Sequence, residues 1–465
     1  MQLALALAAA FMLVRLLRSP DPSLIPDVAA DEGTGPVRRP IVFVYDWPRR
    51  CFELGICREP TLEAARSIRC EELKRSTWRV SHRRDEAACA SNQGYGELLG
   101  PSPFEYSTPQ FSAGSLFAHR LRNSAWRTNN ISEAQLFFVD FDIMLDIPCQ
   151  GCASLLAKND WLHSHVLKSL SFKRFNGLDH FMVHSYMRID GVDSAVFDGP
   201  LHHVTKLTIE NWCYLPHEYD LLRRSHHVSS LTKLPSRWAA VPYPSFFHPI
   251  QSLSNSEWPE SFQPFKKFLL FVGVSVQIGK NDSEPNKVRK ALLSLCETNS
   301  DICQSQKLVR IPNSTEMSFD MYASIYKKMR DSYYVVVPGG DTPTSKRFFD
   351  AIASGAIPLV LDVSIWRCIY TLEPFAGFID SLLETSKRIS FVRKNLTRLF
   401  TWARQDKGDE YRRQLPVLKK MAYSMQYAKE EDPKRFDLVD QVVSRLESVA
   451  GNQSAIFATP TPLVS

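Results

Sequence analysis

The stretch from residue 333 to residue 362, YYVVVPGGDTPTSKRFFDAIASGAIPLVLD, limits the fold more than any other part of the chain. Its opening run, YYVVV, is apolar without a break, which predicts a strand of a parallel sheet that is covered on both faces. The polar loop that follows leads into a helix for which Thr344 or Ser345 is a suitable N-cap. A second apolar run, AIPLVLD, predicts the next strand. This order is that of a βαβ unit.

A βαβ unit of this kind contains a place for an anion. Its loop, PGGDTP, lies at the carboxyl end of a parallel strand, where open α/β sheets bind ligands. The helix start presents unpaired backbone N–H groups, and Lys346 and Arg347 add two positive charges that would face a diphosphate. Asp350, one turn further along, suits the hydroxyls of a ribose. The candidate nucleotide-binding residues are therefore Gly339, Gly340, Asp341, Thr342, Thr344, Ser345, Lys346, Arg347 and Asp350.

The same signals also fit an ordinary βαβ unit in which the polar side chains only cap a helix. Two phosphate-binding motifs with a known mechanism are missing, because the sequence contains neither G-x-x-x-x-G-K-[ST] nor G-x-G-x-x-G. The residues of this segment, taken alone, leave a purely structural role open.

The rest of the chain continues the alternation of strand and helix. Apolar runs predict strands at 41–46, at 134–145, at 178–186 and from Lys267 onward, with helical patterns at 60–75, 155–170 and 321–329. A stretch rich in proline and serine, 242–264, predicts a crossover between two α/β units. We expect an α/β protein with Rossmann-like domains at 41–245 and 265–430, a linker at 246–264, a C-terminal helix at 431–452 and a disordered tail at 453–465.

The segment PGGDTPTSKRFFDAIASGAIPLVLD closely resembles the signature of the exostosin-like glycosyltransferase family, in its plant and algal type. That signature is a proline, a Gly-Asp-[TS] loop, an Arg-rich helix start, FDAI, and a Gly-x-Ile-Pro-Val strand. Between residues 41 and 445, further similar segments follow in the family's order: FAHRLRNSAWRTNNISEAQLFFV, GLDHFMV, VPYPSFFHP, FVGV, VRKALL and KRFDLVDQVVSRL. Ala356 departs from the pattern, where the family often has cysteine.

The resemblance implies two facing Rossmann-like domains of the GT-B type, with the donor in the C-terminal domain and the acceptor in the cleft. It also implies inversion at the anomeric carbon, no catalytic metal and no cofactor. A UDP-sugar would be the donor, and a polysaccharide or a glycoprotein glycan the acceptor. On this basis Asp350 would bind the ribose, Lys346 and Arg347 would stabilise the departing diphosphate, and Thr344 and Ser345 would donate hydrogen bonds to phosphate.

Inversion requires a base that takes the proton of the acceptor hydroxyl. Asp179 and His180, in GLDHF near a strand start of the acceptor domain, are the candidate catalytic residues. A role for His180 in orienting its loop or contacting the donor is left open. Glu210 is a third candidate, for which a structural role is preferred.

A different mechanism is indicated by Asp140 and Asp142, which form a D-x-D tripeptide after the apolar run LFFV. In metal-dependent glycosyltransferases two such acids hold a divalent cation against the diphosphate. Here the strand matches the exostosin-like LFFVP strand, with Asp140 at the position of the usual proline, so a structural role is preferred. A catalytically inactive, glycan-binding homologue is the second alternative.

The cysteines and glycosylation sequons favour an oxidising, secretory compartment. The close pair Cys296 and Cys303 and the group Cys51, Cys57, Cys70 and Cys89 suit disulfides. N-x-[ST] sequons occur at Asn130, Asn281, Asn313, Asn395 and Asn452. Residues 1–18 read as a signal peptide or a signal anchor, and 19–40 as a flexible stem. We therefore expect a lumenal Golgi enzyme, held as a single-pass type II membrane protein by its N-terminal segment.

The charge of the chain argues against nucleic acid as a partner. Its formal net charge is +6, and no block of Lys and Arg resembles a nucleic-acid-binding arm. The expected partners are the UDP-sugar, the glycan acceptor and the membrane, and a homodimer or a heterodimer is left open.

Overall fold

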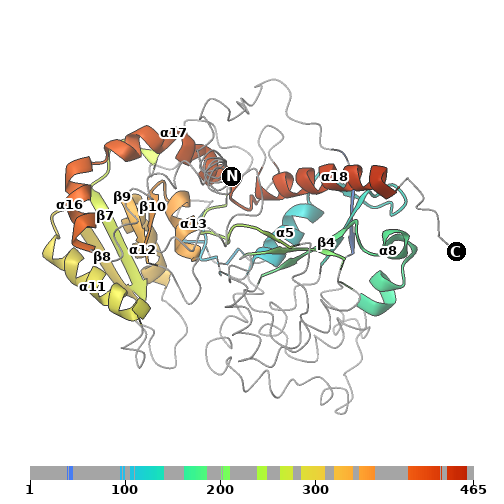
Figure 1. Ribbon diagram of the computed structural model, residues 1–465, viewed down its shortest axis with the longest axis horizontal. Helices are drawn as coiled ribbons and strands as arrows, with labels where there is room; N and C mark the ends of the chain where they lie inside the picture. Colours follow the sequence, from blue (N-terminus) through green and yellow to red (C-terminus); the bar gives the residue numbers. More distant parts are fainter. Residues whose placement is uncertain are drawn as a thin grey trace, which may run out of the picture. The chain divides into compact units, whose positions relative to one another are not determined.

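The computed structural model describes residues 39, 41–45, 95–96, 98–99, 105–108, 110, 112–140, 162–185, 201, 203–209, 238–248, 262–275, 284–308, 319–338, 345–361, 396–429, 431 and 437–457. Two separate parallel β-sheets lie within these ranges (Figure 1). Both are built from short, largely apolar strands that alternate with helices along the chain. This confirms the predicted α/β class with two Rossmann-like units.

The first sheet has six parallel strands in the order β2-β1-β3-β4-β5-β6. In chain order they are β1 (Val42–Tyr45), β2 (Arg127–Thr128), β3 (Leu136–Val139), β4 (His180–His184), β5 (Thr205–Thr208) and β6 (Trp238–Ala240). Helix α5 (Ala113–Arg122) packs on this sheet and contacts β4. The predicted strands at 41–46, 134–145 and 178–186 correspond to β1, β3 and β4.

The described part of the predicted helix at 155–170 is divided in two. A π-helical turn spans Leu162–Leu167, and helix α8 spans Leu170–Phe175. The break has a local cause, since Ser169 adopts an extended conformation and its hydroxyl accepts a hydrogen bond from the backbone N–H of Phe172. Ser169 thus caps a new helix and does not continue the old one.

The second sheet has four parallel strands in the order β10-β9-β7-β8. They are β7 (Phe268–Ser275), β8 (Cys303–Leu308), β9 (Ser332–Val337) and β10 (Ile357–Val360). Its helices are α11 (Glu284–Thr298), α12 (Phe319–Arg330), α13 (Lys346–Ala353) and α16 (Leu396–Asp406). Figure 1 shows the strands between these helices.

Alternate residues of β7 face opposite sides of the second sheet. Leu270, Val272 and Val274 belong to the hydrophobic core that contains buried side chains of α11 and α16. Phe271 belongs to another core, with Ile325 and other buried side chains of α12. The strand is therefore covered on both faces, as its unbroken apolar sequence predicts.

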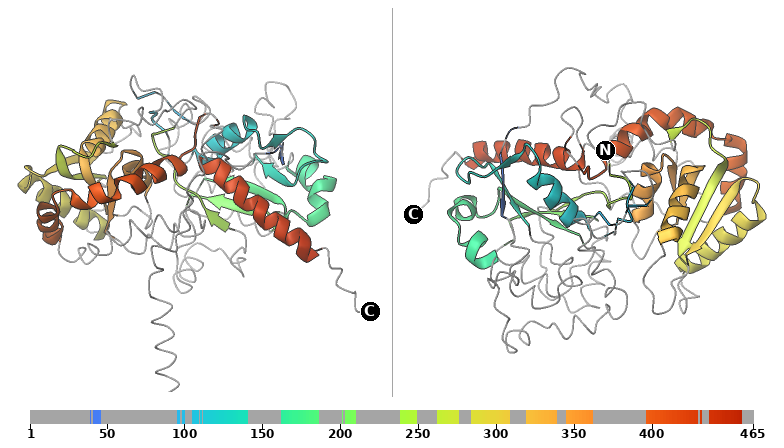
Figure 2. Two further views of the ribbon diagram at one scale, coloured as in Figure 1. Left: turned by 90° about the horizontal axis from the view of Figure 1, so that it is seen from above. Right: turned by 180° about the vertical axis from the view of Figure 1, so that it is seen from behind.

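Two further helices follow the second sheet. Helix α17 (Asp409–Ser424) contacts α13, and helix α18 (Leu438–Phe457) packs on α5 and β3 of the first sheet (Figure 2). Helix α18 ends later than the predicted end at residue 452, because its last turns contain residues that tolerate a helix and the next proline is Pro460.

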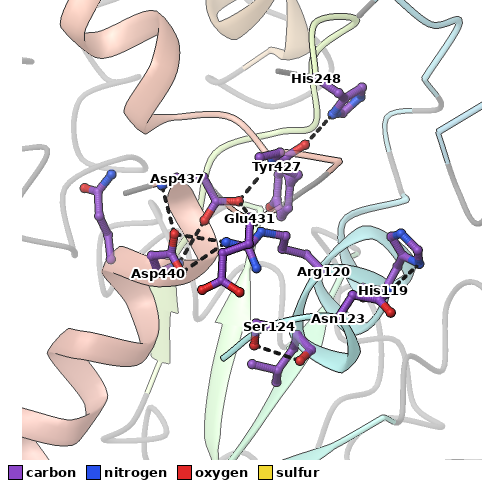
Figure 3. A network of polar contacts seen from close by, with 12 residues as sticks. His119, Arg120, Asn123, Ser124, His248, Tyr427, Glu431, Asp437 and Asp440 are labelled. Atoms are coloured by element: carbon purple, nitrogen blue, oxygen red, sulfur yellow. Dashed lines mark hydrogen bonds and ion pairs between the residues drawn. The ribbon is translucent and has the colours of Figure 1, made fainter. Parts of the chain in front are cut away.

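A buried ionic network fixes the start of α18 against α5 (Figure 3). Asp437 and Asp440 accept hydrogen bonds from each other's backbone N–H groups, which is a reciprocal capping arrangement at the first turn. The guanidinium of Arg120, on α5, donates to Asp437 at 3.0 Å and to both carboxylate oxygens of Asp440 at 3.0 and 3.1 Å. The indole N–H of Trp126 also donates to Asp440 at 2.9 Å.

Cys296, in α11, and Cys303, at the start of β8, form a disulfide bond, which confirms the prediction for this pair. The other cysteines of the sequence lie outside the described residues. Across the described ranges, no helix is both long enough and apolar enough to span a bilayer. The predicted N-terminal segment, residues 1–18, is not among those ranges.

Candidate nucleotide-binding site

The start of helix α13 follows the carboxyl end of β9, as the βαβ prediction requires. Ser345 is its N-cap, with an extended backbone and a hydroxyl that accepts a hydrogen bond from the N–H of Arg347 at 3.2 Å. This decides between the two candidate caps in favour of Ser345. The helix ends before Gly355, whose φ of +63° is in the left-handed region that favours glycine. The predicted loop residues Gly339, Gly340, Asp341, Thr342 and Thr344 lie outside the described residues.

Lys346 and Asp350 form an ion pair one turn apart on α13. The Nζ atom of Lys346 lies 2.7 Å from Oδ1 of Asp350 and also donates to the hydroxyl of Tyr326 at 3.2 Å. Asp350 is buried, and burial raises the pKa of its carboxyl group, whereas the charge of Lys346 and the backbone N–H of Phe246 act in the opposite direction. The positive charge of Lys346 is thus compensated inside the protein.

Arg347 has different surroundings. The pKa of its guanidinium is lowered to about 10, chiefly by burial and also by the charge of Arg289, while the charge of Asp350 acts in the opposite direction. Within the described ranges, the Arg347 side chain has no hydrogen-bond or ion-pair partner. The site therefore holds one arginine whose charge is not matched by a direct contact, close to a second arginine.

Arg289 is a buried cation whose charge acts on Arg347 and which the sequence analysis did not single out. It lies in VRKALL on helix α11, and its side chain is buried, at 7% exposure. The buried positions of this helix are Asn286, Arg289, Leu292 and Cys296, which follow one another at helical spacing. The signal in the sequence was therefore an arginine on the apolar stripe of an amphipathic helix.

The predicted pair Asp179 and His180 does come together. Nδ1 of His180 lies 2.7 Å from Oδ1 of Asp179, and Nη2 of Arg174 donates to Oδ2 of Asp179 at 3.1 Å. The imidazole is buried and stacks on Phe137, with ring centroids 4.6 Å apart. Burial lowers its pKa, so a neutral ring is favoured, and its Nε2 atom has no partner among the described residues.

The position of this pair bears on its role. His180 is the first residue of β4 and Asp179 precedes it, so both lie at the amino end of a parallel strand. Ligands of open α/β sheets bind at the carboxyl ends. The geometry favours the orienting role that the sequence left open, and a catalytic role for either residue stays a prediction.

At the carboxyl end of β3, Asp140 forms an ion pair with Arg122, the last residue of α5. Its partner in the D-x-D tripeptide, Asp142, and the third base candidate, Glu210, are not among the described residues. In the part of the chain that is described, no three potential ligand side chains are grouped as a metal site. The pairing with Arg122 gives Asp140 a structural role that does not require a metal ion.

Comparison with known proteins agrees with the sequence signature. The family model of the exostosin GT47 domain matches residues 37–381. The chain is similar to the xyloglucan-specific galacturonosyltransferase 1 of Arabidopsis thaliana, at 25% identity over 69% of the chain and 43% of the relative. It is also similar to the probable xyloglucan galactosyltransferase GT15 of the same plant, at 24% identity over 68% of the chain and 62% of the relative.

A third relative, the xyloglucan galactosyltransferase MUR3 of Arabidopsis thaliana, is 26% identical over 55% of the chain and 39% of the relative. The chain thus spans about half the length of these curated relatives.

Proposed function

The chain belongs to the exostosin GT47 family, and on this premise we propose that it is a glycosyltransferase that moves a sugar from a UDP-sugar to a polysaccharide. The observation that carries the proposal is the start of α13. Its N-cap, its first turn and Arg347 stand at the carboxyl end of β9, inside the segment with the family signature. The names of the relatives, which refer to xyloglucan, favour a polysaccharide over a glycoprotein glycan.

The proposed chemistry is a displacement at the anomeric carbon that inverts its configuration and needs no metal. Negative charge develops on the diphosphate as the sugar leaves. The N–H groups at the start of α13 and the guanidinium of Arg347 would stabilise that charge, as a divalent cation does in other transferases. Asp350 would accept hydrogen bonds from the ribose.

Two alternatives remain distinct from this proposal. A metal-dependent reaction at Asp140 and Asp142 would be blocked by a chelator, and the pairing of Asp140 with Arg122 argues against it. An inactive, glycan-binding homologue would bind a donor or a glycan without releasing UDP. The disulfide in α11 and β8 supports a secretory compartment, and we propose a lumenal Golgi location for the enzyme.

The test is release of UDP from a panel of UDP-sugars in the presence of xyloglucan, with and without EDTA. We expect one UDP-sugar to be turned over at a rate that EDTA does not change. Arg347→Ala and Asp350→Ala should lower that rate about 100-fold or more. Full activity of both folded variants would refute the site, and no turnover of any donor would refute the enzymatic proposal.

Asp350→Ala needs a stability control. It leaves Lys346 without its carboxylate partner, which should lower the free energy of unfolding by about 1–3 kcal/mol. Arg347→Ala removes no side-chain hydrogen bond or ion pair with any residue that the structure describes, so it should lower activity with little loss of unfolding free energy.

A further inference from the structure

The glycosylation sequon that begins at Asn130 lies in a part of the chain whose side chains the structure describes. Its three residues, NIS, follow strand β2 and lie in the connection to β3. The other sequons lie outside the described residues, at Asn281, Asn313 and Asn395, or within helix α18, at Asn452. A glycan linked to asparagine is bulky and is carried on a surface loop of a secreted protein. The surroundings of Asn130 therefore decide whether the folded chain has room for a glycan there.

Asn130 stands within a continuous exposed segment. All residues from 129 to 133 are exposed. The segment leaves β2, which is the outer strand of the first sheet, and leads to the amino end of β3. The backbone N–H of Gln135 donates there to the carbonyl of Ile41 at 2.8 Å. A glycan on this segment would extend into solvent, away from the carboxyl ends of the strands, where open α/β sheets bind ligands.

Hydrogen bonds fix the orientation of the Asn130 amide. Its Oδ1 atom accepts from the backbone N–H of Ser132 at 3.1 Å, and its backbone carbonyl accepts from that of Glu133 at 3.1 Å. Its Nδ2 atom donates to Oε1 of Glu133 at 2.7 Å. A side-chain amide has two N–H groups, so one still donates to Glu133 when a sugar replaces the hydrogen of the other. The turn therefore keeps these hydrogen bonds when the amide is glycosylated.

We propose that Asn130 carries an N-linked glycan, which the chain receives as it enters the secretory pathway. This assignment rests on the lumenal location proposed above, which the disulfide bond supports. Nδ2 of Asn130 forms a bond to the anomeric carbon of an oligosaccharide that is carried on a polyprenyl diphosphate. The bond from that carbon to the diphosphate oxygen breaks, the diphosphate leaves with the electron pair, and the amide loses one proton. The hydroxyl of Ser132 completes the sequon that the host's oligosaccharyltransferase recognises.

The test is mass spectrometry of the full-length chain, produced in plant cells and treated with a peptide-N-glycosidase in heavy-oxygen water. This treatment converts each glycosylated asparagine into an isotopically labelled aspartate. We expect the label at position 130 in the wild type and its complete loss in Asn130→Gln and in Ser132→Ala. Ser132→Ala removes only the hydroxyl and leaves the amide of Asn130 and the backbone N–H that it accepts from.

Two matched controls should retain the label. Asn129→Gln changes the neighbouring asparagine, which is also exposed but begins no sequon. Ser132→Thr keeps a hydroxyl at the third position of the sequon. Loss of the label in either control would show that the turn, and not the sequon, decides the modification, which would overturn the inference.

The remaining outcomes separate this inference from the proposed location and function. Label confined to the other sequons overturns the inference, while the lumenal location stands. An unlabelled chain in which Cys296 and Cys303 form their disulfide overturns it in the same way. An unlabelled chain with free thiols at both cysteines overturns the lumenal location as well. Transferase activity is not part of this readout, so the release of UDP tests the enzymatic proposal separately.

Discussion

Lys346 and Arg347 are neighbours with the same charge, yet their contacts give them different roles. Lys346 contacts Asp350 and the hydroxyl of Tyr326, whose ring stacks on Phe246 with centroids 3.8 Å apart. It therefore controls the ionisation of Asp350, which burial alone would disfavour. Arg347 remains available to an anion. At the scale of the residue, the proposed function assigns the hydroxyls of the ribose to Asp350 and the phosphate to Arg347.

This separation predicts a shift in the pH dependence of Lys346→Met. Without the ammonium group the pKa of Asp350 rises further, so the carboxylate forms only at higher pH. The acidic limb of kcat/KM should move upward by about one pH unit or more. Lys327→Met, which removes an exposed cation from α12, should leave the limb in place. An unchanged limb in Lys346→Met would mean that Asp350 does not act as a carboxylate.

His248 illustrates a buried residue whose role is purely structural. Its Nδ1–H donates to the carbonyl of Tyr427 at 2.7 Å, and its Nε2 lies 2.7 Å from the hydroxyl oxygen of Thr108. Burial lowers its pKa to about 3. Because the pKa of His248 in the folded state is below its ordinary value of about 6.5, the neutral ring contributes stability that is present above pH 6.5. This contribution is lost as the pH falls toward 3.

We therefore expect acid to destabilise the wild type more than His248→Gln. Between pH 7.5 and pH 4.5 the wild type should lose about 2–3 kcal/mol of unfolding free energy relative to the variant, because only the unfolded histidine gains a proton. Denaturant unfolding at the two pH values measures this. If the difference in unfolding free energy between the two proteins is the same at both pH values, His248 does not titrate in this way.

At the scale of the element, the first turn of α18 depends on a shared charge. The pKa of Asp437 is raised to about 7, and burial is the largest cause. The charge of Arg120 acts to lower this pKa, and the charge of Asp440 acts to raise it. Although burial alone would lower it, the charges of Asp437 and Asp440 raise the pKa of Arg120. One guanidinium thus serves two carboxylates, and the network carries an excess negative charge once both are ionised.

The sign of this effect is opposite to that of His248. Because the folded-state pKa of Asp437 is raised, its contribution to stability is present below about pH 4 and lost as the pH rises through about 7. Asp437→Asn removes this loss, so the variant should be less stable than wild type at pH 5 and closer to it at pH 8. If the difference in unfolding free energy between wild type and Asp437→Asn grew as the pH rose, the raised pKa of Asp437 would be contradicted.

At the scale of the whole molecule, the two titrations oppose each other over the same pH range. His248 adds stability and Asp437 removes it as the pH rises from about 4 to about 7. The wild type should therefore show a flatter stability profile in this range than either single variant. In Asp437→Asn, the unfolding free energy should fall more steeply as the pH is lowered. In His248→Gln, it should fall as the pH rises toward neutral.

The parts of the fold that the sequence predicts are those with unbroken apolar strands. Strands β3, β7 and β9 are mainly apolar, and the central residues of each are buried, so their sequences have little other choice. Strand β8, CQSQKL, was missed because it lies at a sheet edge, where polar residues are tolerated. Strand β5, TKLT, was missed because it contains a lysine. Lys206 is nevertheless buried, and its ammonium group donates to the carbonyl of Leu201.

The sequence predicts some residues of the candidate site and misses others for a similar physical reason. The helix start and the Lys346–Asp350 spacing follow from local sequence, since the residues concerned are within one turn. The role of Arg120 was not predicted, because charged residues are usually solvated and its buried partners are far along the chain. Arg120 and Asp437, for example, are 317 residues apart. No short-range pattern reports such a pair.

The most direct test of the central claim is hydrogen–deuterium exchange of the native protein with and without saturating UDP. In the proposed function, the diphosphate binds to the N–H groups that open α13, beside Arg347. We predict slower exchange in peptides covering residues 345–350, and none of this protection with uridine. Protection confined to other segments, with the opening turn of α13 unchanged, would contradict the account.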